Sequence, residues 1–255
     1  MTDAFDVAGE FAPAENLSVS ATSVDTPSEA VEAAAPEAPN GFVELGLAPE
    51  LVQAVADLGY TQPTAVQQKA IPMAMVGAGS DNGGKFIDLM VSSQTGSGKT
   101  AAFLLPVLHT LIQQQAESQA RERAEFEQAC ADAAAKGEPL PKRAKRKDPT
   151  NPRNFKAATP GALVLCPTRE LAQQVAHDAI ELVKHCRGLR IANVVGGMPY
   201  QLQIAKLQNA DLVVATPGRL LDLQRSMQIK LDQVQFLVVD EADRCLLYTS
   251  PSPRD

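Results

Sequence analysis

Five short apolar runs, rich in Val, Leu and Ile, constrain the fold of this chain more than any other feature. Runs of this kind suit strands that are buried on both faces. Helical segments separate them: Leu171, Val175, Ala179 and Leu182 are spaced by four, four and three residues, which places one apolar stripe against a sheet. This alternation predicts an α/β fold with a parallel sheet, and ligands beyond the carboxyl ends of its strands. The predicted strands are residues 86–91, 162–166, 190–195, 211–216 and 236–240.

The composition predicts a globular protein rather than a membrane protein. The 255 residues are 45% hydrophobic and 21% charged, enough for one large domain or two small ones. No apolar run approaches the roughly 20 residues that cross a bilayer, and the first residues have no features of an export signal. The four cysteines form no C-x-x-C pair, so neither a metal site nor a disulfide framework is indicated. We expect a reduced, cytoplasmic protein with no membrane partner.

The net charge of −7 comes from the beginning of the sequence. Residues 1–40 hold eight acidic residues and no Lys or Arg, which leaves 23 basic and 22 acidic residues in the remainder. This first segment is rich in Ala, Pro, Glu and Ser and has too few large apolar side chains to offset the entropy lost on ordering. It is predicted to be a disordered acidic tail.

A second change in composition spans residues 113–159. The first half of this segment is helix-prone and polar on most sides. The second half concentrates basic residues among prolines and includes the run KRAKRK at 142–147. We interpret the segment as a charged insertion, a projecting helix followed by a flexible loop.

A phosphate-binding turn follows the first predicted strand. The sequence SSQTGSGKT at 92–100 directly precedes the predicted helix AAFLLPVLHTLI. A glycine-bearing turn there points backbone N–H groups into one concavity at a helix N-terminus, so polyphosphate is the expected occupant. Lys99 would reach the β- and γ-phosphates, and the Thr100 hydroxyl would bind Mg²⁺. Ser93 replaces the first glycine of the G-x-x-x-x-G-K-[ST] pattern, a mild departure because a small residue still permits the turn.

An acidic pair at the end of the last predicted strand supplies the second half of a nucleotide site. Asp240 follows FLVV at the carboxyl edge, where a carboxylate can hold phosphate-bound Mg²⁺ through water. Glu241 could orient and deprotonate the water that attacks a phosphoanhydride. The predicted catalytic residues are therefore Lys99, Asp240 and Glu241, and the predicted metal ligands are Thr100 and Asp240.

Six short motifs, taken in order, resemble those of the first RecA-like lobe of the DEAD-box ATP-dependent RNA helicases. SQTGSGKT (93–100) and DEAD (240–243) are similar to motifs I and II. GYTQPTAVQ (59–67), with Phe42 seventeen residues before Gly59, resembles the Q motif. PTREL (167–171), GG (196–197) and TPGR (216–219) resemble motif Ia, the glycine pair and motif Ib. The resemblance covers about residues 42–244 apart from the insertion, and implies a parallel-sheet, RecA-like P-loop NTPase lobe over residues 41–244.

The resemblance also implies roles for individual residues. Gln67 would present a donor and an acceptor to the adenine edge, Phe42 would stack on the ring, and Tyr60 would lie at the same site. ATP and Mg²⁺ are the implied cofactors, and RNA would be held through its backbone with little sequence specificity. The implied phosphate-binding residues are Gln94, Thr95, Gly96, Ser97, Gly98, Lys99 and Thr100, and the implied RNA-binding residues are Thr168, Arg169, Gly197, Thr216, Gly218 and Arg219.

The implied activity is RNA-stimulated ATP hydrolysis coupled to local unwinding of RNA duplexes, with a second helicase lobe in the full-length protein. After Arg244 the sequence CLLYTSPSPRD resembles none of the family's motifs, so we interpret residues 245–255 as an aberrant tail. Loss of the strand that the family places next would expose a sheet edge and leave the chain marginally stable. The alternative function is a catalytically inactive fragment, at most a weak ATP- and RNA-binding module.

The basic run at 142–147 is separate from these motifs, and its role stays open. It could add salt-sensitive affinity for RNA phosphates, serve as a nuclear import signal, or be a functionally silent, solvated loop.

Overall fold

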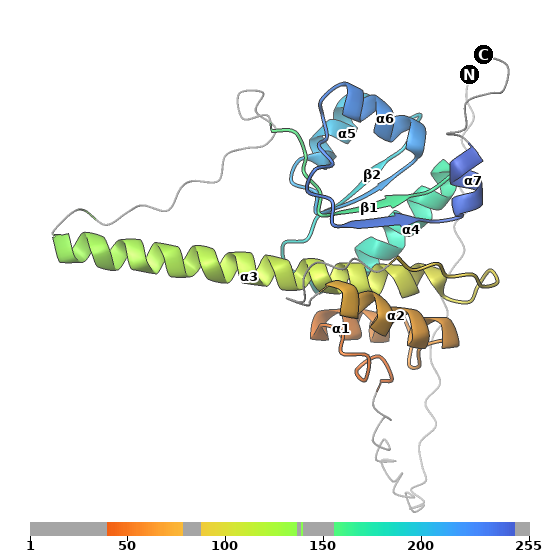
Figure 1. Cartoon of the computed structure of the whole chain (residues 1–255), viewed down its shortest axis with the longest axis horizontal. Coiled ribbons are helices and arrows are strands. Elements are labelled where there is room, and N and C mark those ends of the chain that lie inside the picture. The colour runs from red at the N-terminus through yellow and green to blue at the C-terminus, as the bar shows by residue number, and fades with distance from the viewer. Residues whose placement is uncertain (1–39, 79–87, 137–138, 140–155, 248–255) are drawn as a thin grey trace, which may run out of the picture. The chain divides into compact units, whose positions relative to one another are not determined.

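The apolar runs form a parallel sheet in the computed structural model, which describes residues 40–78, 88–136, 139 and 156–247. Its strands are β1 (Ala162–Leu165), β2 (Ile191–Val194), β3 (Leu212–Ala215) and β4 (Phe236–Val239), in the order β2-β3-β1-β4. Every pairing is parallel, so the carboxyl ends of the strands meet at one edge (Figure 1). The predicted α/β fold with a parallel sheet is confirmed. The predicted acidic tail and the basic run at 142–147 lie outside the described residues, except for Asn40.

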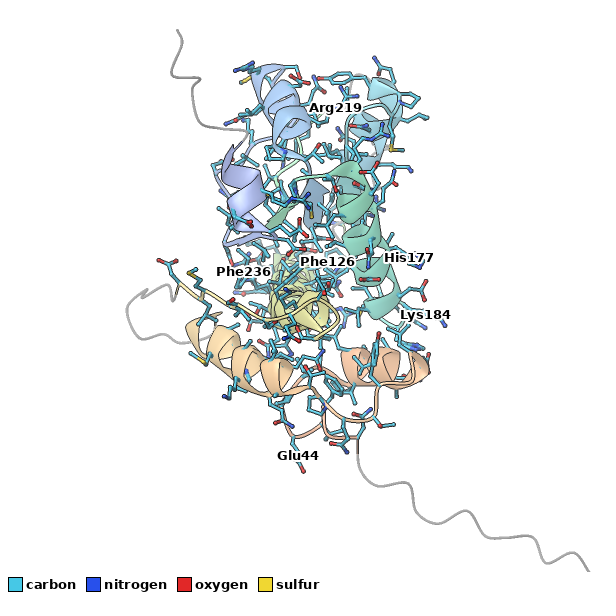
Figure 2. The ribbon with its side chains drawn as sticks, turned by 90° about the vertical axis from the view of Figure 1, so that its right-hand side faces the viewer. Glu44, Phe126, His177, Lys184, Arg219 and Phe236 are labelled. Carbon is cyan, nitrogen blue, oxygen red and sulfur yellow. The ribbon has the colours of Figure 1, made fainter. Side chains whose placement is uncertain are left out.

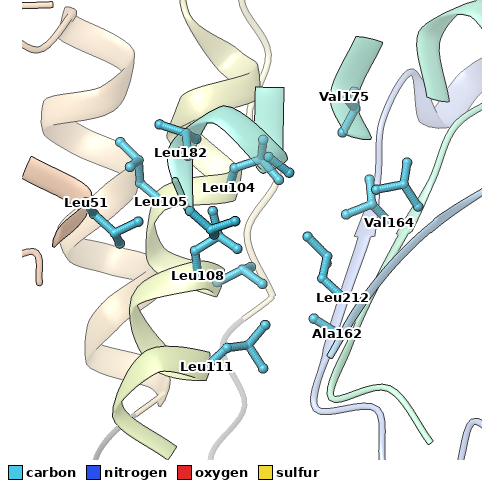
Figure 3. Packing of buried hydrophobic residues seen from close by; sticks show 14 of the residues in the cluster. Leu51, Leu104, Leu105, Leu108, Leu111, Ala162, Val164, Val175, Leu182 and Leu212 are labelled. Atoms are coloured by element: carbon cyan, nitrogen blue, oxygen red, sulfur yellow. The ribbon is translucent and has the colours of Figure 1, made fainter. Parts of the chain in front are cut away.

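One face of the sheet packs on α3 (Lys99–Lys136) and α4 (Arg169–Leu182). Successive strand residues point to opposite faces, and the residues on this face contribute Val164 and Leu212 to the main core (Figure 3). Leucines of α3, including Leu104 and Leu108, fill the space opposite them. The helices α1 (Pro49–Asp57) and α2 (Ala65–Ala78) pack against this layer from beyond α3 (Figure 1).

The opposite face of the sheet is covered by α5 (Tyr200–Leu207) and α6 (Pro217–Arg225) (Figure 1). Leu163 and Val213, which alternate with the residues of the first face, pack here against Leu207 and Leu223. Each strand is therefore covered by helices on both sides where it lies inside the sheet, which explains why its sequence is a continuous apolar run.

The apolar stripe predicted for residues 171–182 forms the inner face of α4. Val175, Ala179 and Leu182 are buried, and Leu171 packs against the same core while partly exposed. Thr168 begins the helix, because its side-chain oxygen accepts a hydrogen bond from the backbone N–H of Leu171 at 3.3 Å. The stripe prediction is confirmed.

A buried histidine joins α3 to the start of α1. His109 is 7% exposed, and its Nδ1 atom accepts a hydrogen bond from the backbone N–H of Ala48, the N-cap of α1, at 2.9 Å. The bond satisfies one of the N–H groups that have no partner inside a helix at its N-terminus. Burial lowers the pKa of this imidazole.

The helix expected at the start of the 113–159 segment is the continuation of α3, which runs unbroken for 38 residues. Buried side chains are concentrated between Ala102 and Leu111, and from Ala116 onward most side chains are exposed. The first part of α3 is therefore a core helix and the second part extends beyond the core. Whether the segment is an insertion stays a prediction, and residues 140–155 lie outside the described residues.

The strand predicted at 86–91 is wrong for the part that the structure describes. Residues 88–91 have no strand conformation, and Met90 is 98% exposed. In the strand order β4 is an edge strand, and no described strand lies between it and residues 88–91. Because a strand exists only through hydrogen bonds to a neighbour, an apolar sequence alone is insufficient. The same edge exposes β4, where Leu237 is 61% exposed.

The last described element is α7 (Ala242–Leu247), which follows the acidic pair. Cys245, the first residue of the predicted aberrant tail, is buried in this helix, and its thiol donates to the carbonyl of Asp240 at 3.2 Å. The helix therefore extends to Leu247, and residues 248–255 are outside the description. Among the described helices, none is both long enough and apolar enough to cross a membrane.

Candidate nucleotide and nucleic-acid site

Residues 93–100 form a glycine turn that leads into the N-terminus of α3. Gly96 and Gly98 have φ values of 79° and 82°, in the left-handed region that favours glycine. Because α3 begins at Lys99, its free N–H groups and the positive end of its dipole lie at this turn and favour an anion. The residues that the turn exposes to solvent are Gln94, Thr95 and Gly96.

Polar side chains within the turn bond to one another. Lys99 Nζ donates to the carbonyl of Ser93 at 2.5 Å, and the hydroxyls of Ser93 and Ser97 are 2.6 Å apart. Ser93, the position at which the sequence departs from the strict glycine pattern, thus contributes both its backbone and its side chain. Lys99 lies across the turn in this conformation, and Thr100 beside it is partly buried at the first turn of α3.

The start of α2 is hydrogen-bonded to the glycine turn. Gln67 is 6% exposed, and its Nε2 donates to the carbonyl of Gly98 at 3.1 Å while its Oε1 accepts from the N–H of Thr64 at 2.9 Å. The Thr64 hydroxyl donates to the carbonyl of Ser97 at 2.9 Å. Both polar ends of Gln67 are therefore bonded within the protein. The contact of Thr64 with the turn was not predicted from the sequence, because a threonine before a helix is usually an ordinary N-cap.

The three residues assigned to adenine do not share one exposed surface in this conformation. Phe42 is 1% exposed and belongs to the main core with Leu51. Tyr60, by contrast, is 54% exposed, and its carbonyl accepts a hydrogen bond from Asn40 Nδ2 at 3.2 Å. Only Gln67 is bonded directly to the glycine turn.

The acidic pair lies at the carboxyl end of β4, where the sequence placed it. The N–H of Asp240 donates to the carbonyl of Leu165 at the end of β1 at 2.9 Å. Burial raises the pKa of the Asp240 carboxyl, and the nearby positive charge of Lys99 acts in the opposite direction. The lysine of the turn and the strand-end carboxylate are thus close enough to interact electrostatically.

Glu241 has an unusual backbone conformation, with φ of 47°. A non-glycine residue in the left-handed region is uncommon, and such outliers cluster at functional sites. Its carboxylate pairs with Arg244 at 2.9 Å, and its N–H donates to Asp240 Oδ1 at 3.0 Å. The carboxylate is therefore held at the surface beside Asp240.

The donors assigned to a metal have the chemistry that Mg²⁺ prefers. Thr100 would supply a hydroxyl oxygen and Asp240 a carboxylate oxygen, both hard ligands. Within the described ranges, no group of three or more His, Cys, Asp or Glu side chains could hold a metal ion unaided. Two oxygen donors from the protein suit Mg²⁺, which usually takes its other ligands from phosphates and water.

The residues assigned to RNA gather at the carboxyl ends of β1, β2 and β3. Thr168 caps α4, and Arg169 at the start of that helix reaches across to the carbonyl of Gly196 at 3.4 Å. Gly197 has φ of 81°, and a methyl group on it would collide with the Arg169 guanidinium. The left-handed φ favours glycine there, and a side chain would also displace the Arg169 guanidinium.

Arg219 approaches the same loop from the opposite side. Its Nη2 donates to the carbonyl of Met198 at 2.9 Å, and its guanidinium lies 5.3 Å from the centre of the Tyr200 ring. Figure 2 shows Arg219 at the top of the view, at the opposite end from Glu44. Thr216 is the N-cap of α6, and its N–H donates to the carbonyl of Val194 at 3.1 Å. Gly218 lies in the first turn of the same helix. The structure thus brings all six residues to one edge of the sheet.

A parallel sheet with a glycine turn before α3 and an acidic pair after β4 is the architecture of a RecA-like lobe. The sequence model of the family described as DEAD/DEAH box helicase matches residues 64–250, and the chain belongs to this family. Its enzymes include ATP-dependent RNA helicases, as the names of its relatives state.

Two of these relatives come from a plant and a bacterium. The chain is 37% identical over 224 residues to DEAD-box ATP-dependent RNA helicase 52A of Oryza sativa subsp. japonica, covering 87% of this chain and 31% of that protein. It is 38% identical over 206 residues to ATP-dependent RNA helicase SrmB of Haemophilus influenzae, covering 80% of this chain and 36% of that protein. The chain thus spans about a third of the length of these relatives.

Two solved structures of RNA helicases also resemble this chain in fold. The RNA helicase Prp28 from Chaetomium thermophilum bound to ADP matches with a TM-score of 0.54 and 31% identity, over 80% of this chain and 39% of that one. A hypothetical ATP-dependent RNA helicase from Sulfolobus tokodaii matches with a TM-score of 0.52 and 30% identity, over 78% and 43% of the two chains. The RecA-like fold expected from the motifs is confirmed.

Proposed function

We propose that this chain is the ATP-binding lobe of an ATP-dependent RNA helicase, in which ATP hydrolysis depends on bound RNA. The observation that carries the proposal is that two groups of residues lie at the same carboxyl edge of the sheet. One group is Lys99 with the Asp240–Glu241 pair, and the other is the loop 196–198 with Arg169 and Arg219, which bond to it. Nucleotide and RNA chemistry would then share one edge of one sheet. Local unwinding of duplexes and a second lobe belong, in this proposal, to a longer protein.

In the nucleotide site, Lys99 exchanges the carbonyl of Ser93 for the β- and γ-phosphates, which are stronger acceptors for an ammonium group. The N-terminal N–H groups of α3 and the glycine turn surround the phosphates. Thr100 and Asp240 would hold Mg²⁺, which would supply positive charge next to the transferred phosphoryl group. Glu241 leaves Arg244 and accepts a proton from the attacking water.

Recognition of adenine is assigned to Gln67, Phe42 and Tyr60. The side-chain amide of Gln67 already donates a hydrogen bond to the carbonyl of Gly98 in the glycine turn. An adenine that bonds to this amide would therefore also affect the contact between Gln67 and the turn. Tyr60 is accessible for stacking, whereas Phe42 would have to leave the core. We therefore assign the first contact with the ring to Tyr60 and Gln67.

RNA binding is assigned to Thr168, Arg169, Gly197, Thr216, Gly218 and Arg219. Hydroxyls, backbone N–H groups and guanidinium groups suit sugar and phosphate oxygens, and such contacts position a strand without reading its bases. The proposed partner is therefore RNA of little sequence specificity. A cytoplasmic location is part of the proposal, and the four unpaired cysteine thiols are consistent with a reducing compartment.

The proposal predicts RNA-stimulated phosphate release from ATP and Mg²⁺ by the purified chain. Glu241→Gln should lower the stimulated rate by about 10²- to 10⁴-fold, because the carboxylate that accepts the proton is lost, while fluorescent-nucleotide binding stays within about twofold. Phosphate release is measured with and without single-stranded RNA. Asp232→Asn, at an exposed position outside the motifs, is the control for the loss of one carboxylate.

The alternative is a chain that binds ATP and RNA weakly without hydrolysis. The edge position of β4 favours it, because among the described strands the one that precedes Asp240 pairs with a neighbour on one side only. Nucleotide binding without any phosphate release, with or without RNA, would support this alternative. Absence of both nucleotide and RNA binding would contradict the proposed function and the alternative together.

A further inference from the structure

Gln203 is a buried polar residue that the motifs do not account for. It lies in α5 and is 1% exposed, although its amide needs partners for two donor hydrogens and an oxygen. Its Nε2 donates to the carbonyl of Val195 at 2.6 Å and reaches that of Met198 at 3.5 Å. Its Oε1 accepts from Arg219 Nε at 3.2 Å. One side chain thus connects α5, the loop after β2, and α6.

Three of the four carbonyls of the loop 195–198 are bonded from within the protein. Gln203 and Arg219 both donate to Met198, Gln203 donates to Val195, and Arg169 donates to Gly196. In contrast, the N–H groups of residues 196–198 donate to no acceptor among the described residues. With most of the carbonyls occupied, the N–H groups are the larger set of polar groups that the loop offers to a ligand.

The backbone of this loop suits an anion. Gly197 has φ of 81°, and successive N–H groups next to a left-handed residue form the concavity known as a nest, which binds phosphate or carboxylate groups. The guanidinium of Arg169 lies against Gly197 and adds positive charge. Both features depend on the loop keeping its shape, because the glycine pair has no side chains to hold it.

We propose that Gln203 is a positioning residue for RNA binding. It holds the carbonyls of Val195 and Met198 and the Arg219 side chain, and so keeps the N–H groups of the glycine loop available for one phosphate of the RNA backbone. Gln203 itself does not touch the RNA. The proposal rests on the proposed function and deepens it, since it identifies the group that shapes part of the RNA site.

The test compares two buried glutamines of the same helix region in the full 255-residue chain. Gln203→Met keeps the length of the side chain and removes all of its hydrogen bonds. Gln208→Met is the matched control: it changes the C-cap residue of α5, which is 6% exposed and makes no hydrogen bond to the described residues of the loop. Binding of a short fluorescein-labelled single-stranded RNA is followed by fluorescence anisotropy with a non-hydrolysable ATP analogue present.

We expect Gln203→Met to weaken RNA binding by about tenfold, because two hydrogen bonds that fix the loop and one that fixes Arg219 are lost. Affinity for the nucleotide analogue should change by less than about twofold, and Gln208→Met should leave both affinities unchanged. A general loss of folding would move both affinities together, so this split distinguishes positioning from simple destabilisation.

A second measurement does not need RNA. Amide hydrogen exchange, followed by mass spectrometry, should become faster across residues 203–206 of α5, whose N–H groups are hydrogen-bonded, in Gln203→Met and stay unchanged there in Gln208→Met. Equal exchange in the two variants would overturn the positioning role, as would faster exchange spread over β1 and β3. Faster local exchange with unchanged RNA affinity would overturn the link to RNA. If the unsubstituted chain binds no RNA, the proposed function fails, and the exchange result alone decides whether Gln203 shapes the loop.

Discussion

Gly98 combines two reasons for glycine at a single position. Its φ of 82° is unfavourable for other residues, and a methyl group on it would collide with the Gln67 amide. Gly96 has nearly the same φ, 79°, but open space where a methyl group would go. A comparison of Gly98 with Gly96 therefore separates two effects within one turn: the strained backbone, which both positions share, and the close contact, which only Gly98 has.

Gly98→Ala should weaken nucleotide binding at least tenfold more than Gly96→Ala. Both substitutions cost about 1 kcal/mol in backbone conformation. The first also pushes Gln67 away from the Gly98 carbonyl and separates α2 from the phosphate loop. Titration with a fluorescent ATP analogue measures the difference. Equal losses in the two variants would show that the contact with Gln67 does not support the nucleotide site.

At the residue scale, the sequence indicated which side chains suit phosphate chemistry, and those roles stay predictions, but it did not indicate which groups these side chains contact. Lys99, Asp240 and Glu241 were identified because their residue types and strand-end positions suit phosphate chemistry. That Lys99 bonds to Ser93 and Glu241 to Arg244 could not be predicted, because both contacts depend on side-chain conformations. The burial of Gln203 could not be predicted from the sequence, because a glutamine in a short helix is usually exposed at the surface.

Between elements, the bond from Ala48 to His109 is the contact most sensitive to pH. It joins α1 to α3 and requires an unprotonated Nδ1. In the unfolded chain this histidine has its ordinary pKa of about 6.5, and burial lowers the pKa in the folded state. The unfolded state thus binds more protons, so the stabilisation is complete above about pH 6.5 and is lost as the pH falls through the folded pKa.

His109→Gln should reduce the loss of stability between about pH 7 and pH 5.5, because glutamine does not titrate but still offers an oxygen to Ala48. Urea midpoints at several pH values in this range measure the effect. His177→Gln, at an exposed position on α4, is the control and should leave the pH dependence unchanged. An identical pH dependence in the His109 variant would show that this histidine does not carry it.

The elements themselves were predictable where local pattern and tertiary neighbours agree. The α4 stripe and the apolar runs of β1, β2, β3 and β4 became the expected helix and strands. Residues 88–91 have an equally apolar sequence but no neighbouring strand among the described residues, and they are not a strand. The apolar pattern of a segment therefore predicts that it tends to be buried. Whether the segment joins a sheet depends on neighbouring strands, which its own sequence does not specify.

For the whole molecule, the exposed edge of β4 predicts self-association. None of the residues of β4 is fully buried, whereas every residue of β3 is, and open, apolar edge strands pair with other chains. Leu237→Lys should lower the association constant measured by sedimentation by about tenfold or more, because a lysine on an edge strand opposes pairing.

Leu221→Lys is the control for this substitution, because Leu221 is 43% exposed on α6, away from the sheet edge. It should leave the association unchanged. Equal association of both variants and the unsubstituted chain would show that the β4 edge is not the contact surface. The proportion of monomer should also fall with protein concentration, as mass action requires.

The unbroken helix α3 has a mechanical consequence. Its first residue is the lysine of the phosphate turn and its last is Lys136, and at 1.5 Å per residue the 38 residues span about 57 Å. Only the first part of α3 packs against the main core. A small tilt of the packed turns, such as a bound triphosphate could impose, becomes a displacement many times larger at the far tip. The position of the far end of α3 would thus be a sensitive measure of any tilt at the proposed nucleotide site.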